Sequence, residues 1–475
     1  MPATPISAPD RQRRRLLKAA ALAGASAGCA CSAPDPLVVD DVSQLNPIRV
    51  AQLATPASTA QIQQALRESA GPVSIGGARF SMGGQVAMAD SLHLDMRGMN
   101  RLVWLDVAGR HARVQAGMRW RDLQEILDPH DLAVKVMQSY SDFSVGGSVS
   151  VNCHGRYVGA GPVVESVRAL QLVGADGNVR ELSRNKDAAL FRAVVGGYGG
   201  LGVISEVELD LAVNGVIARH AQRVTLPDYP AFFRDQVVGN PAVVLHNADL
   251  APPDFDQPLA VSWIASDAKL TQSERLVPRK LNYAREQNLI WAASELPGSQ
   301  WLRERYAEEN LLRERAVVHR NFEASLDTAS LEPRTRIFST YLLQEYFIPV
   351  AAFLPFARRM ADILRRYQVN ALNISIRHSP PDTTTLLAWA PTEVFSFDKQ
   401  RSSQSADFAT RQWTQHLINA ALDAGGRYYL PYRLHATPDQ FLHAYPEAAA
   451  FARIKKQVDP AYRFRNQLWE KYLPA

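Results

Sequence analysis

Two glycine-rich stretches have the residue types best suited to bind a ligand through backbone amides. The first, residues 71–85, reads GPVSIGGARFSMGGQ, and a short apolar strand at 73–75 leads into it. Glycines at such a junction let several amide groups converge on one anion, as in phosphate-binding loops. The stretch therefore predicts a phosphate cradle. The alternative is a glycine-rich hairpin turn.

The second stretch, residues 144–161, reads SVGGSVSVNCHGRYVGAG and is dominated by small residues. Small side chains leave room for a flat ligand to lie against the backbone. This stretch also contains His154, whose imidazole could hydrogen-bond such a ligand. The alternative role for His154 is that of a buried structural residue.

A third glycine run, Gly196–Gly202, contains the pattern GxGxxG from Gly197 onward. In a dinucleotide-binding Rossmann fold this pattern leaves a strand and opens a helix. Here it follows an expected helix at 188–195 and enters an expected strand at 203–209. Because the order is reversed, we do not expect a nicotinamide-binding Rossmann domain.

The composition indicates an ordered protein with two or more domains, since 47% of the 475 residues are hydrophobic and 21% are charged. Much of the formal charge of +5 lies in a basic cluster at residues 11–18, so we expect no nucleic-acid partner. Two of the three cysteines lie within the first 31 residues, which leaves Cys153 as the thiol of a mature chain. We therefore expect neither a disulfide framework nor a metal site.

Residues 1–33 have the order of segments found in an export signal. The basic sequence RRRLLK at 13–18 precedes a short apolar run at 19–28. Its paired arginines resemble the twin-arginine consensus, which predicts periplasmic export of a folded protein. The sequence SAGC ending at Cys29 also resembles a lipobox, in which Cys29 would carry a lipid anchor on the outer side of the membrane. A basic amphipathic first helix is the alternative.

Strands and helices alternate between residues 48 and 214, which indicates a mixed α and β domain. The expected strands there are 48–53, 73–75, 92–96, 102–105, 112–116, 167–173, 179–182 and 203–209, and the expected helices are 58–66, 120–127 and 188–195. Near residue 215 the pattern changes, which indicates a second domain. Its expected strands are 336–347, 371–377 and 384–390, and its expected helices are 353–367 and 408–421.

Four motifs in series resemble the flavin domain of the vanillyl-alcohol oxidase superfamily, whose FAD-binding domain is of the PCMH type. They are IGGARFS at 75–81 with Gln85, VGGS at 145–148 with NCHG at 152–155, ADG at 175–177, and VGGYGGLGVI at 195–204. Within the superfamily, the pattern is similar to decaprenylphosphoryl-ribose oxidase and to sugar-lactone and alditol oxidases.

The resemblance implies an α+β fold, in which a two-part PCMH-type FAD-binding domain is joined to an α+β cap domain built on an antiparallel sheet. The implied FAD-binding domain is 40–214, and the substrate or cap domain is 215–425. Residues 426–475 form a C-terminal segment that returns to the FAD-binding domain.

The resemblance also implies FAD as cofactor, with its pyrophosphate on residues 76–81, its isoalloxazine ring beside 146–155 and its adenine near 203–204. The implied cofactor-binding residues are Gly76, Gly77, Ala78, Arg79, Phe80, Ser81, Gln85, Gly146, Gly147, Ser150, Asn152, His154, Gly155, Val203, Ile204 and Asn466. Many relatives attach FAD covalently to a histidine immediately before the serine of the first loop. In this chain that position is Phe80, so we expect noncovalent FAD.

The implied activity is hydride transfer from a CH–OH group of a sugar-like or related alcohol to FAD, with oxygen, a quinone or a cytochrome as electron acceptor. Two alternatives remain. One is an FAD-dependent reductase of a carbon–carbon double bond, and the other is a flavin-binding protein without turnover.

The implied catalytic residues are His154, Glu345, Arg377 and Tyr432. Glu345 belongs to a segment, QEYFIP at 344–349, that resembles a cap strand of the family. Ser375 and Tyr432 stand where alditol and lactone oxidases have a glutamate and a lysine, which argues against a plain alditol or lactone oxidase. The alternative role for each candidate is a structural hydrogen bond.

Overall fold

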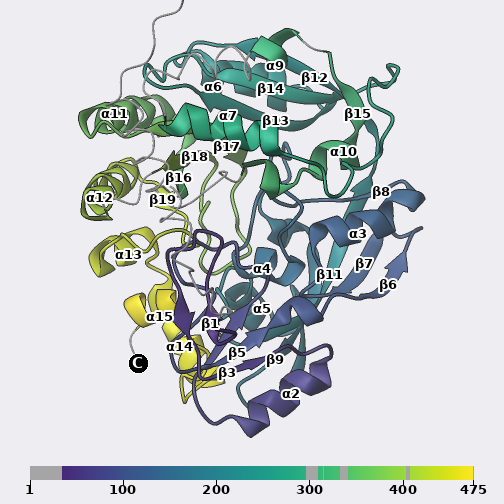
Figure 1. The fold of residues 1–475 in the computed structure, drawn as a ribbon, viewed down its shortest axis with the longest axis vertical. Helices are drawn as coiled ribbons and strands as arrows, with labels where there is room; N and C mark the ends of the chain where they lie inside the picture. The colour runs from purple at the N-terminus through teal and green to yellow at the C-terminus, as the bar shows by residue number, and fades with distance from the viewer. Residues whose placement is uncertain (1–34, 296–308, 314, 332–340, 403–406, 474–475) are drawn as a thin grey trace, which may run out of the picture.

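The computed structural model describes residues 35–295, 309–313, 315–331, 341–402 and 407–473. In Figure 1 the strands up to residue 213 form the lower part, and a larger sheet forms the upper part. The helices of the C-terminus return to lie beside the N-terminal strands. The predicted export signal at 1–33 lies outside the described residues.

Among the described residues, the lower part contains three sheets. A small parallel sheet has the order β3 (Gln52–Ala54), β5 (Leu92–Asp95), β4 (Val73–Gly76). An antiparallel sheet has the order β10 (Val179–Ser183), β9 (Val167–Val173), β11 (Val203–Val213), β7 (His111–Gln115), β6 (Leu102–Asp106), and β8 (Leu132–Val134) also pairs with β11. The third sheet is the pair β1 (Val38–Val39) and β2 (Ile48–Arg49).

The described α-helices that accompany these strands in the N-terminal part of the chain are α2 (Thr59–Glu68), α3 (Trp120–Leu127), α4 (Val145–Ser150) and α5 (Ala188–Val194). The side chain of Ser58 caps α2 by accepting a hydrogen bond from the Gln61 amide at 3.3 Å. Ile62 and Leu66 are buried on its inner face, as the apolar spacing predicts.

The upper part is an antiparallel sheet of eight strands. Its order is β15 (Val317–His319), β12 (Val216–Arg223), β14 (Leu259–Ala265), β13 (Val243–Leu250), β17 (Ala371–Ser379), β18 (Val394–Ser402), β16 (Tyr341–Pro349), β19 (Arg427–Tyr428). Together with the lower part, this sheet confirms the predicted mixture of helices and antiparallel sheets.

The described helices of the second half are α6 (Tyr229–Phe232), α7 (Ala284–Glu295), α9 (Glu309–Arg313), α10 (Arg320–Ala324), α11 (Phe353–Arg366), α12 (Asp407–Asp423), α13 (Pro438–Ala444), α14 (Ala448–Val458) and α15 (Gln467–Tyr472). Helix α11 packs on one face of the large sheet, where Phe353 and Phe356 meet Phe397 at ring-centroid distances of 5.4 and 5.0 Å. This face is apolar, which leaves the opposite face for polar side chains.

The predicted strand at 384–390 is wrong, because these residues form a loop, and the strand of this region is β18. The Asp382 amide closes the loop by donating to the Ala390 carbonyl at 2.7 Å. Asp382 Oδ1 accepts from the amides of Thr384 and Thr385 at 2.8 and 2.9 Å. These local bonds compete with strand pairing, which an apolar pattern alone does not reveal.

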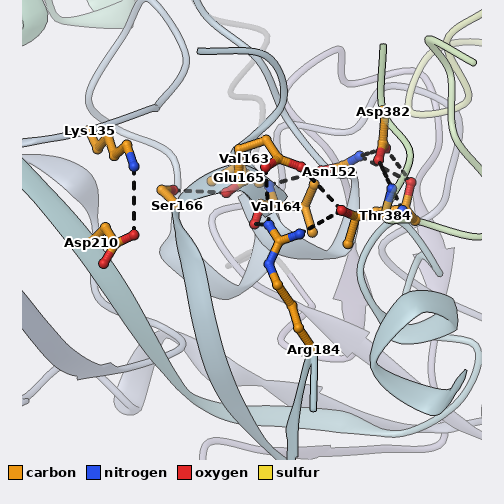
Figure 2. Close-up of polar contacts among 11 residues, drawn as sticks. Lys135, Asn152, Val163, Val164, Glu165, Ser166, Arg184, Asp210, Asp382 and Thr384 are labelled. Atoms are coloured by element: carbon orange, nitrogen blue, oxygen red, sulfur yellow. Dashed lines mark hydrogen bonds and ion pairs between the residues drawn. The ribbon is translucent and has the colours of Figure 1, made fainter. Parts of the chain in front are cut away.

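The same loop fastens the upper part to the lower part (Figure 2). Asn152 Nδ2 donates to Asp382 Oδ2 at 2.9 Å, and Arg184 Nη1 donates to Thr384 Oγ1 at 2.6 Å. Trp389 Nε1 donates to the Asn152 carbonyl at 2.8 Å. The large sheet is therefore held at a fixed position over the second glycine-rich stretch.

The C-terminal segment forms a second fastening. The Val73 amide donates to the Arg463 carbonyl at 2.6 Å, and the Arg465 amide donates to the Val73 carbonyl at 2.9 Å. Phe464 thereby extends the small parallel sheet beside β4. The end of the chain thus lies against the strand that leads into the first glycine loop.

We predict that Asp382→Ala lowers the free energy of unfolding by about 2–4 kcal/mol, because it leaves two loop amides and the buried Asn152 side chain without their acceptor. Chemical denaturation of the purified protein measures this change. The control is Asp423→Ala, which removes an exposed ion pair with Arg359 and should cost less than about 1 kcal/mol. An Asp382→Ala protein as stable as this control would show that the loop contributes nothing.

Candidate active site

A cavity of about 450 Å³ lies between the two glycine-rich stretches and the polar face of the large sheet. Its walls also include residues of the C-terminal segment. Of the predicted site residues, those that line it are Gly77, Ala78, Arg79, Phe80, Ser81, Gln85, Gly146, Gly147, Ser150, His154, Ile204, Glu345, Arg377 and Tyr432. Segments far apart in the sequence therefore meet at one site.

The first glycine loop runs along the cavity wall in close contact with Ser144. The Ala78 amide donates to Ser144 Oγ at 3.1 Å, and a Cβ atom added to Gly77 would lie 2.2 Å from the same oxygen. Arg79 has a positive φ of 63° and turns its guanidinium to Asp95 Oδ2 at 3.0 Å. These contacts hold the loop backbone at the cavity wall.

Phe80 also lines the cavity, with its ring 4.3 Å from the ring of Phe143. An imidazole is therefore absent from the loop position where covalently flavinylated relatives have one.

The second stretch contributes helix α4, whose glycines allow close packing. A Cβ atom on Gly146 would lie 2.6 Å from Ala116 Cβ, and one on Gly147 would lie 2.8 Å from Ser144 Oγ. Both glycines and Ser150 line the cavity. Small residues on two facing walls fit the phosphates and the flat ring system of FAD.

Gln85 uses its side chain to connect the first loop with the C-terminal segment. Its amide nitrogen donates to the carbonyls of Leu430 and Tyr432 at 2.7 and 2.9 Å, and its amide oxygen accepts from the Gly83 amide at 2.8 Å. The Met82 amide donates to the Pro431 carbonyl at 2.7 Å. These bonds fix the backbone that carries Tyr432 next to the loop.

Five predicted cofactor-binding residues lie outside the cavity lining: Gly76, Asn152, Gly155, Val203 and Asn466. The contacts of Gly155 and Asn466 show how such residues support the structure around the cavity. A Cβ atom on Gly155 would lie 2.1 Å from the Met137 carbonyl oxygen, so glycine is needed there for packing. Asn466 caps α15 and donates to the Tyr198 carbonyl at 2.7 Å.

The four predicted catalytic residues all line this cavity. His154 Nε2 lies 2.8 Å from Glu345 Oε1, and both side chains are buried, with relative exposures of 6% and 1%. The Tyr432 hydroxyl lies 3.5 Å from Glu345 Oε2. A buried acid thus lies between an imidazole and a phenol.

The environment of Glu345 favours its charged form. Burial alone would raise the pKa of this carboxyl group, but contact with His154 and the nearby charge of Arg377 outweigh burial and leave the pKa below its usual value. Glu345 is therefore a carboxylate at neutral pH. Because its folded-state pKa is depressed, its stabilising contribution is present above the ordinary carboxyl pKa and is lost as pH falls through the lowered value.

Aromatic rings enclose the imidazole of His154. The ring centroids of Trp389, Phe347 and Tyr429 lie 4.8, 5.6 and 5.9 Å from it. The Tyr429 hydroxyl donates to the Val151 carbonyl at 2.9 Å, which fixes this ring. These rings thus shield the His154 and Glu345 pair from water on one side. Exclusion of water strengthens the electrostatic interaction between the two side chains.

Further polar residues of the cavity wall were not predicted from the sequence, namely Tyr140, Arg156, Asn247, Asp249 and Asn373. Burial raises the pKa of Tyr140 to about 12, so its hydroxyl keeps its proton at neutral pH. The available signal was the alternation of polar and apolar residues in NADL at 247–250 and NISIR at 373–377. Such alternation predicts a strand but does not show that its polar face borders a cavity.

Comparison with known proteins agrees with this geometry. A family model described as a FAD binding domain matches residues 50–183. The decaprenylphosphoryl-beta-D-ribose oxidase of Mycolicibacterium smegmatis is 26% identical over 82% of this chain and 86% of its own length. L-Gulonolactone oxidase of Mus musculus is 36% identical over 26% of this chain and 28% of its own length. Alditol oxidase of a Streptomyces species is 34% identical over 24% of this chain and 28% of its own length.

The fold, the cavity and these matches define an FAD-dependent oxidoreductase. These matches agree with the PCMH-type FAD oxidoreductase family that the four motifs resemble.

We predict that Gly77→Ala weakens FAD binding at least tenfold, because the added methyl group would overlap Ser144 Oγ and break the hydrogen bond that this oxygen accepts from the Ala78 amide of the loop. Fluorescence titration of apoprotein with FAD measures the affinity. Gly71→Ala is the matched control, since a Cβ atom there meets nothing within 4 Å. Combining Gly77→Ala with Ser144→Gly should restore part of the affinity, and equal FAD affinities for all these proteins would contradict the cradle.

Proposed function

We propose that this protein oxidises a CH–OH group of a sugar-like or related alcohol, with FAD as the hydride acceptor. The observation that supports this most directly is the buried His154 and Glu345 pair, which meets Tyr432 on the wall of the cavity that the glycine loops border. The relatives named as ribose, lactone and alditol oxidases support the substrate class.

Alcohol oxidation requires a hydride acceptor and a base for the hydroxyl proton. When bound, FAD supplies the hydride acceptor at N5 of its ring. The glycine loop at 77–81 would hold its phosphates, and Gly146, Gly147 and Ser150 would border its ring. The remaining requirement, removal of a proton, falls to side chains of this chain.

Tyr432 and Glu345 are placed for this proton transfer. The Glu345 carboxylate lies within 3.5 Å of the Tyr432 hydroxyl, so it can draw the phenol proton as Tyr432 accepts the proton of the substrate hydroxyl. His154, 2.8 Å from the other carboxylate oxygen, orients the carboxylate and shares its charge. Arg377, on the same wall, would stabilise negative charge that develops on the substrate or the reduced cofactor.

We predict that Tyr432→Phe lowers kcat by about 10²–10⁴-fold with an unchanged FAD content, because a positioned acid–base group contributes about that factor. Glu345→Gln should give a loss of similar size. Stopped-flow measurement of flavin reduction by alcohols tests both, with Tyr367→Phe as the control outside the cavity lining. If Tyr432→Phe reduces its flavin at the wild-type rate, Tyr432 has no part in proton transfer.

The proposed substrate class also has a direct test. Anaerobic mixing with alcohols should bleach the flavin absorbance. Bleaching by dithionite alone, followed by reoxidation with an activated alkene, would instead indicate a carbon–carbon double-bond reductase. A flavin that no alcohol reduces and no alkene reoxidises would indicate a binding protein without turnover. Once an alcohol has bleached the flavin, oxygen, a quinone and a cytochrome can be compared as electron acceptors in the same preparation.

We propose that FAD is bound noncovalently, because Phe80 offers no nucleophile at the position of the attaching histidine. Acid precipitation should leave all flavin in the supernatant. A flavin that stays with the precipitated protein as an 8α-histidyl adduct would contradict this proposal.

We further propose that residues 40–214 and 426–475 form the FAD-binding domain and that 215–425 form the cap that covers its reactive side. The arrangement of the sheets on either side of the cavity supports this division. The arginine pair at 13–14 supports twin-arginine export to the periplasm, with Cys29 as a lipid attachment site, and cell fractionation with arginine-to-lysine variants tests it. Within the described residues no helix is long and apolar enough to cross a membrane.

A further inference from the structure

A second polar cluster lies on the cavity wall, separate from Glu345. Asn373 Nδ2 donates to Asp249 Oδ1 at 2.8 Å, and Asn247 Nδ2 donates to Asp249 Oδ2 at 3.2 Å. These three residues, here called the Asp249 cluster, all line the cavity. One carboxylate and two amides offer several acceptors and donors at one place.

The surroundings of the Asp249 cluster point to a ligand. Asn373 Oδ1 is buried and has no hydrogen-bond partner among the described residues. A buried acceptor without a donor costs stability, so a ligand hydroxyl that donates to it would bind favourably. On the other face of the same strands, Leu250 and Ile374 are fully buried in the core. The polar side chains therefore belong to the cavity face of the sheet.

The register of the sheet sets the distance between the Asp249 cluster and Glu345. Asp249 pairs with Ser375, position 375 pairs with position 398, and position 398 pairs with Glu345. Paired residues share a face, so Asp249 and Glu345 lie at the two ends of one row across β13, β17, β18 and β16. Three strand spacings separate their backbones by about 14 Å.

We propose that the Asp249 cluster is a specificity site for hydroxyl groups remote from the carbon that is oxidised. The substrate is then a polyhydroxylated molecule longer than one sugar ring, because it reaches from the Glu345 end of the row to the Asp249 end. This inference rests on the proposed alcohol oxidation and adds the length and the polarity of the substrate to it.

Binding of polyols of increasing length tests the specificity site. The probes are glycerol, xylitol, sorbitol and maltitol. Their binding is measured by calorimetric titration into holoenzyme that dithionite has reduced, because the reduced holoenzyme cannot oxidise them. The wild-type protein should bind maltitol at least tenfold more tightly than glycerol. Asp249→Asn and Asn373→Ala should each weaken maltitol binding about tenfold and leave glycerol within about twofold, since each removes contacts only to the remote end.

The control is Asp423→Asn, an exposed position on α12, and the flavin spectrum and unfolding temperature show whether each variant is folded. The inference would be overturned by any of three results. They are maltitol affinities equal to wild type in both cluster variants, equal losses of affinity for glycerol and maltitol, and no binding of any polyol. Altered FAD affinity with unchanged polyol preference would also overturn the inference, because this result would place the Asp249 cluster against the cofactor. Length-dependent binding without flavin bleaching by any alcohol would overturn the proposed oxidation alone.

Discussion

The contact between His154 and Glu345 is the interaction on which the site depends. It joins the second glycine-rich stretch, which includes α4, to strand β16 of the large sheet. A buried carboxylate is stable only when an opposite charge or hydrogen-bond donors compensate it, and losing one partner of such a pair is strongly destabilising. The position of the large sheet over the glycine loops is therefore coupled to the chemistry that this pair can perform.

The rest of the molecule keeps that contact in place. The loop that follows β17 attaches to Asn152 and Arg184, and Gln85 attaches the C-terminal segment to the first glycine loop. Two of these fastenings lie at or near a catalytic candidate, since Asn152 is close to His154 and the carbonyl of Tyr432 itself accepts from Gln85. The geometry of the cavity thus results from several hydrogen bonds and not from a single strong one. Such bonds are directional, which suits a site where a hydroxyl proton must be transferred over a short distance.

Much of the lower part was predictable because its signals are local. The Ser58 cap, the apolar spacing of Ile62 and Leu66, and the glycine motifs each act over a few residues, and the structure places α2, α3 and β9 where the sequence indicated them. The prediction of a strand at 384–390 was wrong because the Asp382 carboxylate accepts hydrogen bonds from local amides and the loop also bonds to a distant part of the chain. The Asp249 cluster could not be predicted for a related reason. Its residues come from β13 and β17, and only their pairing in the sheet brings them together.

We propose that one cavity holds FAD and presents an alcohol to the acid–base group formed by Tyr432 and Glu345. The most direct measurement is the visible absorption spectrum of the purified protein, recorded before and after anaerobic addition of polyols. We expect a flavin absorption band that polyols bleach. A protein that is folded but colourless and takes up no FAD, or a flavin that dithionite bleaches and no polyol does, would contradict it.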